Sequence, residues 1–261
     1  MFLKKYKSFY RFLGMIGVAS VLLYYYQKAY EFFKGDRVLF YTKMFTMNFL
    51  LRDEDGYISS MTIPDLYARH VRSHQEYREK SAESALDFQE DQKLLLEKAI
   101  EKVQSFFHTL NNPWIDKERM LGILWKIAMT KNNTYEDGLP HTREDVIFIT
   151  PRLLDLPEAQ LIKTLIHERV HIYQRVYEFQ FQEQIKAHGY SVWRERKGYP
   201  LIRSNPDVDT YIYQTPTGEI MVAVYTSSQP HHIQDTMQPN ALKEHPYEEI
   251  AYQIAELYKG V

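Results

Sequence analysis

Three stretches of the chain place apolar residues at helical spacing. Within residues 84–110, the apolar positions three or four apart are Leu96, Ile100, Val103 and Phe107. This spacing gathers them on one face and predicts an amphipathic helix. Pro157 stands at a favourable first-turn position for a second helix, over 157–182. A third helix is expected to start near Pro246, in "PYEEIAYQIAELY".

Other stretches alternate apolar and polar positions, which is the pattern of strands. "LWKIAMT" (124–130) and "DVIFIT" (145–150) predict two strands joined by a long loop rich in turn formers. "DTYIYQ" (209–214) and "EIMVAVYT" (219–226) flank "TPTG" and predict a hairpin. The helix over 157–182 therefore follows a strand directly.

The part of the chain before residue 84 has a different pattern of residues. Residues 28–80 mix aromatic and charged side chains and predict helical segments that break at Gly35 and around residues 53–56. No internal repeat is visible. We therefore expect three parts: an N-terminal segment over 1–27, a helical region over 28–115, and a core over 116–261.

The N-terminal segment has a basic flank, "MFLKKYKSFYR", followed by an uncharged run over 12–27, "FLGMIGVASVLLYYYQ". The run is shorter than the roughly 20 residues of a spanning helix, but interfacial tyrosines and flanking lysines extend its usable length. We expect a single-pass membrane anchor. The basic flank then leaves the N-terminus in the cytoplasm and the core on the non-cytoplasmic side. A cleaved signal peptide and a buried core helix are the alternatives.

Composition excludes several kinds of chemistry. The chain has no cysteine, so disulfides, thiolate nucleophiles and sulfur-ligated zinc sites are absent. Any metal must be held by nitrogen and oxygen. The net charge of −2 and the lack of an arginine-rich stripe argue against a nucleic-acid partner.

The helix over 157–182 contains "HERVH", with His167 and His171 four residues apart. That spacing puts both imidazoles on one helix face, where their nitrogens can meet at one metal ion. Glu168, rotated by about 100° from His167, would lie beside the metal as a general base. A chance match is the alternative, since the chain has ten histidines. The apolar residues around the motif favour the metal site, because buried histidines and acids need a partner.

A third ligand must come from elsewhere in the chain. The metzincin extension of this motif requires glycine and histidine where Gln174 and Tyr177 stand, so it is excluded. "EHPYEEIAY" (244–252) offers two adjacent acids, Glu248 and Glu249.

The two acids lie on different faces of the predicted helix. Glu248 shares its face with Ala251, Tyr252 and Ala255, and the alanines allow close approach to the first helix. Glu249 shares its side with polar residues and is expected to face water. We favour Glu248 as the ligand. Both acids could instead simply stabilise the first turn of their helix.

"HERVH" and "HPYEEIA" together resemble the gluzincin group of zincin metallopeptidases, over roughly residues 120–258. The resemblance implies an α+β fold with a small mixed sheet, an HExxH helix and a C-terminal ligand helix. It implies Zn²⁺ held by His167, His171 and Glu248, with Glu168 as general base. It also implies an edge strand above the cleft that pairs with an extended peptide, for which residues 145–150 are the candidate.

The resulting interpretation is a membrane-anchored zinc metallopeptidase that acts on a peptide or protein substrate by Glu168-assisted attack of zinc-bound water. His231, His232 and Tyr225 are weaker candidates for stabilising an oxyanion, and His141 for lining the cleft. Two alternatives stay open. One is a non-enzymatic, membrane-tethered assembly protein in which His231 or His232 closes a four-ligand structural site. The other is a hydrolase that acts on a non-peptide amide.

Overall fold

The structure is a computed structural model that describes residues 38–237 and 244–260. The chain divides into units 1–39 and 40–261, and nearly all described residues belong to the second. The predicted membrane anchor at 12–27 and the predicted break at Gly35 lie outside the described residues. Among the described helices, none combines the length and the apolar character needed to cross a bilayer.

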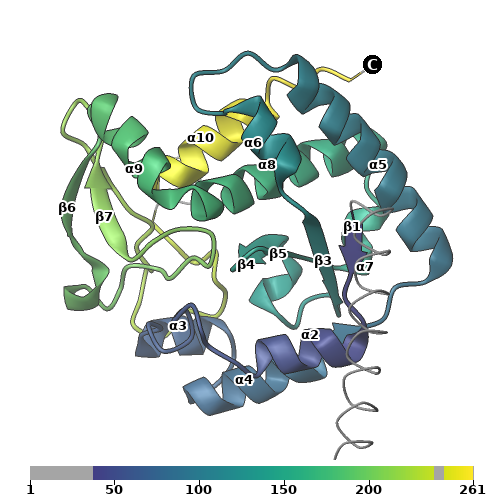
Figure 1. Ribbon diagram of the computed structural model, residues 1–261. Helices are drawn as coiled ribbons and strands as arrows, with labels where there is room; N and C mark the ends of the chain where they lie inside the picture. The colour runs from purple at the N-terminus through teal and green to yellow at the C-terminus, as the bar shows by residue number, and fades with distance from the viewer. Residues whose placement is uncertain (1–37, 238–243, 261) are drawn as a thin grey trace, which may run out of the picture. The chain divides into compact units, whose positions relative to one another are not determined.

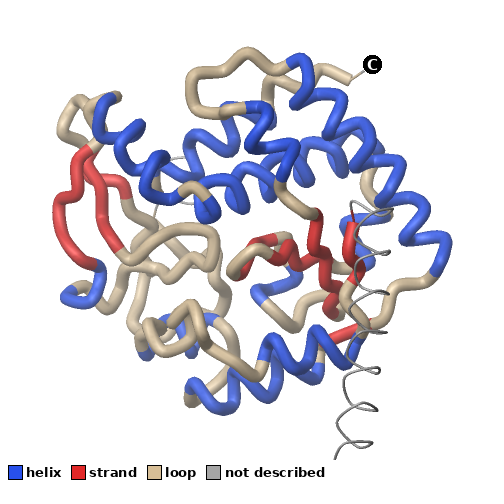
Figure 2. Tube along the Cα trace, in the orientation of Figure 1, coloured by secondary structure: helices blue, strands red, loops and turns tan. Residues whose placement is uncertain are grey.

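The fold is α+β, with two separate groups of strands (Figure 2). The larger sheet is mixed and contains β1 (Val38–Phe40), β2 (Ala85–Leu86), β3 (Trp125–Thr130), β4 (His141–Arg143) and β5 (Val146–Ile149). β3 and β5 pair in parallel, whereas β2 pairs with β3 and β4 with β5 in antiparallel fashion. The predicted strands at 124–130 and 145–150 are therefore confirmed.

The predicted role of residues 145–150 as the edge strand is wrong. β5 lies between β3 and β4, so β4 forms that edge of the sheet. β4 escaped prediction because its sequence, His-Thr-Arg, has no apolar alternation, although all three of its residues are buried. Polar partners, rather than apolar packing, make this burial tolerable.

Both faces of the sheet are covered by helices (Figure 1). Ala128, Val146 and Phe148 belong to one buried cluster with residues of α2 (Lys43–Leu50) and α4 (His74–Glu83). The residues that alternate with them point to the opposite face, where α8 lies against β4 and β5. This two-sided burial explains why β5 reads as a continuous apolar run.

Three further helices pack together, with α8 (Glu158–Val176) in contact with both α5 (Glu90–Thr109) and α10 (Pro246–Ala255). The four apolar residues that predicted α5 are all buried. Its start was predicted too early, because Ala85–Leu86 pairs with β3 as β2. The helix predicted over 157–182 instead breaks at Tyr177, and α9 (Glu178–Ala187) follows with its own buried residues, Phe181 and Ile185.

The smaller sheet is antiparallel and contains β6 (Ser191–Glu195), β7 (Tyr211–Gln214) and β8 (Ile220–Met221). The predicted hairpin is confirmed as β7 and β8, with β8 shorter than expected; β6 was not predicted. The remaining elements are α3 (Ile63–Ala68), α6 (Lys117–Gly122), α7 (Pro151–Leu154) and two 3-10 turns, Glu136–Gly138 and Arg196–Gly198. The break predicted around residues 53–56 separates α2 from α3.

A buried ion pair joins α3 to the loop that precedes β4. The guanidinium of Arg69 donates to both carboxylate oxygens of Glu136, at 2.9 and 2.7 Å, and both side chains are 3% exposed. Burial alone would raise the pKa of Glu136, but the charge and hydrogen bonds of Arg69, together with His141 and the Tyr77 hydroxyl, lower this pKa to about 2. Glu136 also has a φ of 48°. This is a left-handed backbone conformation, which a residue other than glycine adopts only when the surrounding structure holds it in place.

We expect Arg69→Met to destabilise the protein strongly, because it leaves the Glu136 carboxylate buried without its cation. Breaking such a pair costs about 3–5 kcal/mol, which corresponds to a fall in Tm of roughly 6–20 °C for a chain of this size. Thermal unfolding measures it. Arg52→Met, which removes an exposed pair with Glu54, is the matched control and should cost less than about 1 kcal/mol. Equal shifts for the two variants would contradict the assignment.

Candidate metal centre

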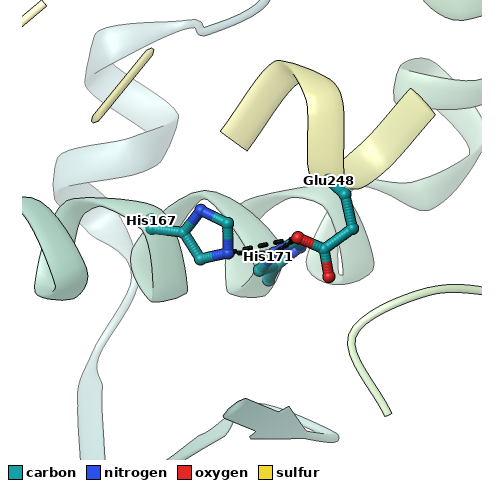
Figure 3. A group of neighbouring side chains, drawn as sticks. All are labelled: His167, His171 and Glu248. Carbon is teal, nitrogen blue, oxygen red and sulfur yellow. Dashed lines mark hydrogen bonds and ion pairs between the residues drawn. The ribbon is translucent and has the colours of Figure 1, made fainter. Parts of the chain in front are cut away.

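Three buried donor residues meet where α8 and α10 pack side by side (Figure 1). α8 contributes His167 and His171, and α10 contributes Glu248, whose carboxylate extends toward the two imidazoles (Figure 3). The two Nε2 atoms are 3.0 Å apart. Oε2 of Glu248 lies 3.3 Å from Nε2 of His167 and 3.6 Å from Nε2 of His171.

The start of α10 sets the position of Glu248. His245 caps this helix, with its Nδ1 accepting the backbone N–H of Tyr247 at 3.1 Å, and Pro246 follows at the first turn. Glu248 therefore stands in the first turn, three residues after the cap. Ala251 and Ala255, both buried, let α10 approach α8 closely, as their small size predicted.

The three distances fit a metal ion with short bonds. At the tetrahedral angle, donors about 2.0–2.1 Å from zinc lie about 3.3 Å from one another. The observed separations of 3.0, 3.3 and 3.6 Å bracket that value. The donor set, two imidazoles and one carboxylate, is one that catalytic zinc sites use. The group could therefore hold a metal ion.

Gln174 orients one ligand and links both ligand helices. Its Oε1 lies 2.8 Å from Nδ1 of His171, and its Nε2 donates to the backbone oxygen of Tyr247 at 3.0 Å. Because the amide oxygen can only accept, Nδ1 of His171 carries the proton and Nε2 directs its lone pair toward Glu248 and His167. One fully buried amide thus fixes the His171 tautomer and the register of α10.

Glu248 is held on its other side by Asn205. The amide nitrogen of Asn205 donates to Oε1 of Glu248 at 2.6 Å and also to Oε1 of Glu244. Oε2 of Glu248 is thereby left to face the histidines. The tyrosine ring of Tyr252 packs against His167, with 4.3 Å between ring centroids.

The electrostatics of the group favour a positive charge at its centre. Burial alone would raise the pKa of Glu248, but His171 and His167 lower it well below its usual value. Burial alone would lower the pKa of His171, but the charge and hydrogen bond of Glu248, together with Asp207 and Gln174, raise it. Both shifts come from the attraction between the Glu248 carboxylate and the imidazoles beside it.

Glu168 stands next to this group and has a different environment. It is 3% exposed, and its Oε2 has no hydrogen-bond partner among the described residues. Burial, followed by the charges of Asp207 and Glu248, raises its pKa well above the usual value for a glutamate. A buried carboxyl group without a partner is costly, so its position beside three candidate metal ligands makes it a candidate functional residue.

A cavity of about 380 Å³ gives access to these side chains. His167, Glu168 and Glu248 line it, together with Tyr252, Leu139 and Leu153. Its volume lies at the low end of pockets that bind small molecules, about 300–1,000 Å³.

The other predicted residues lie in different places. Glu249 turns away from the metal centre and accepts a hydrogen bond from Tyr190. His231 and His232 are exposed, and their backbone N–H groups donate to Asp235. Neither histidine joins the donor group in the described part of the chain.

Tyr225 and His141 are both buried. The Tyr225 hydroxyl donates to Asp65 at 3.2 Å and accepts from Arg69, so it belongs to the buried ion-pair network. His141 stabilises its own turn, with Nδ1 2.9 Å from the backbone oxygen of Leu139, and also lines the cavity. The expectation that His141 lines the cleft is consistent with this position.

Two residues near the donor group, Asn205 and Asp207, were not predicted from the sequence. Both lie in the loop before β7; Asn205 donates to Glu248, and Asp207 lines the cavity. "RSNPDVD" carries no periodic signal that could have found them. Gln174 shares the histidine face of its helix, so its position was visible, but not its hydrogen bonds.

Comparison of the chain with known protein families, with curated proteins and with solved structures finds no match.

We expect Glu248→Gln to weaken zinc binding severely, whereas Glu249→Gln leaves it unchanged. Only the first removes a charged donor from the centre. Zinc affinity should fall by more than the about 10–100-fold that is expected when a residue that only contacts a metal ligand is removed. Zinc competition with a chromophoric chelator measures the affinity. Equal affinities for the two variants would exclude Glu248 as a ligand.

Gln174→Ala should lower zinc affinity by about 10–100-fold, because His171 loses the acceptor that fixes its tautomer. The same competition assay measures this loss. Gln160→Ala, an exposed position on the same helix, is the control and should bind zinc like the parent. An unchanged zinc affinity for Gln174→Ala would show that the hydrogen bonds of Gln174 do not contribute to zinc binding.

Proposed function

We propose that the protein is a zinc-dependent metallopeptidase. The observation that carries the proposal is the buried group of His167, His171 and Glu248 with the unpartnered carboxyl of Glu168 beside it, at a cavity. A divalent cation bound by the three donors would supply Lewis acidity toward a substrate carbonyl oxygen.

The chain's own residues supply the proton transfer. Glu168 can take a proton from the attacking water at Oε2 and pass it to the leaving amine. Its raised pKa suits this exchange, because a carboxyl with a pKa nearer neutrality both accepts and releases a proton. Gln174 and Asn205 hold two of the three donors in place, so the donors need little rearrangement when substrate binds.

The donor count supports a catalytic site over a structural one. Structural zinc sites are closed by four protein ligands, whereas catalytic sites commonly have three. In the described residues the group comprises three donors, and no further histidine, cysteine or acid joins it. An assembly protein with a stapling metal is therefore the less favoured function. A non-peptide amide substrate would use the same chemistry and is distinguished by substrate assay.

The proposed localisation rests on the N-terminal sequence alone. The basic flank and the uncharged run over 12–27 support a membrane-anchored enzyme, with its catalytic unit on the non-cytoplasmic side.

Glu168→Gln should keep the bound zinc and lose hydrolysis. The amide keeps the shape of the side chain but cannot shuttle a proton, so kcat should fall by about 10²–10⁴-fold. Hydrolysis of a peptide library, read by mass spectrometry, and elemental analysis of the purified protein measure the two properties. A Glu168→Gln variant that hydrolyses peptides at the parent rate would exclude this mechanism.

A further inference from the structure

One loop segment, residues 203–207, forms a wall of the metal cleft; we call it the partition segment. Its five residues line the cavity of about 380 Å³ described above. They also line a second cavity of about 360 Å³, which contacts His171 on the other side. The partition segment therefore divides the space around the metal centre into two.

Hydrogen bonds attach the partition segment to several other parts of the fold. Arg203 donates to Glu244 and Asn205 to Glu248, on or next to the ligand helix. The Ser204 N–H donates to Asp65 at 2.8 Å, and the Pro206 oxygen accepts from Arg175 of α8 at 2.6 Å. Several of these bonds involve charged groups, which make the stronger hydrogen bonds. The segment is thus a fixed wall.

Asp207 also occupies the sheet edge that an extended peptide would need. In an antiparallel pair, residues alternate between bonding across the pair and facing away from it. In β4, Thr142 is the residue whose N–H faces away, and both this N–H and the Thr142 hydroxyl donate to Oδ1 of Asp207. A substrate strand cannot take that N–H while Asp207 holds it. The mode of binding expected from an open edge strand is therefore blocked here.

The charged residues that line the cleft indicate which end of a substrate peptide can bind there. Its cations are already paired: Arg69 with Glu136, Lys163 with Glu256 and Arg203 with Glu244. A substrate carboxylate would find no unpaired cation among the described lining residues. Asp207 and Glu168, in contrast, are lining acids without an ion pair, and Oε2 of Glu168 has no partner. The cleft therefore suits an ammonium group.

We infer that the cleft receives the amino-terminal end of a peptide, so that the enzyme removes residues from a free N-terminus, with Asp207 determining this specificity. The inference rests on the proposed metallopeptidase function. The small cavity, bounded by the partition segment, accepts a chain end rather than the middle of an extended chain. Asp207 would stabilise the substrate ammonium at this wall.

The test uses one peptide sequence in three forms: both ends free, N-acetylated, and C-amidated. The zinc-loaded full-length protein, in detergent, should shorten the first and third forms from the N-terminus. N-acetylation should lower kcat/KM by roughly 10- to 100-fold, as expected for loss of a charged hydrogen bond, and amidation should have little effect. Internal cleavage of the acetylated peptide at an undiminished rate, or a loss on amidation alone, would overturn the inference and leave the metallopeptidase function intact. No hydrolysis of any form by zinc-loaded protein would overturn both.

Asp207→Asn identifies the residue responsible. The amide keeps an acceptor for Thr142 but loses the charge, so the preference for the free amine over the acetylated form should fall by roughly 10-fold or more, mainly through KM. Asp155→Asn, an exposed change outside the lining residues, is the control and should keep the preference. Zinc content and Tm show whether each variant is folded. A folded Asp207→Asn variant with the parent preference would exclude Asp207.

Discussion

The contact between α8 and α10 brings a carboxylate and two imidazoles together in a place where water is nearly excluded, and much of the surrounding structure follows from it. Glu248 is 4% exposed and His171 is fully buried. Unpaired, such groups would each cost several kcal/mol. They are instead brought within 3.6 Å of one another, which requires close helix packing. Ala251 and Ala255 permit that approach, and Gln174 fixes its register by bonding to both helices.

The same constraint explains why a loop far along the chain is attached to the centre. Burying Glu248 beside Glu244 creates a repulsion between carboxylates. Asn205 relieves it by donating to both, and Arg203 compensates the charge of Glu244. The loop must therefore pass close to the metal centre, and it carries Asp207 onto the edge of β4. The proposed restriction on substrate binding is in this sense a consequence of how Glu248 is stabilised.

Local periodicity was enough to predict the centre but not its surroundings. His167, Glu168 and His171 follow from spacing on one helix, and the choice of Glu248 over Glu249 follows from which face carries alanines. β4 and the partition segment could not be predicted, because their burial depends on single polar contacts with residues distant in sequence, such as Asp207 with Thr142. β2 was read as the start of α5 for a related reason: pairing with β3 overrode the helical tendency of residues 85–86.

Glu168 gives the strongest support for our proposal that the donor group serves chemistry rather than stability. A metal that only joined α8 to α10 would need the three donors and nothing from position 168. A paired or apolar side chain there would make the fold more stable, since a buried polar group without a partner costs about 1–3 kcal/mol, and more when charged. The chain instead keeps a carboxyl group at a cavity wall, where burial and then the charges of two further acids, Asp207 and Glu248, raise its pKa. Costs of this kind are typical of functional sites, where local stability is given up for reactivity.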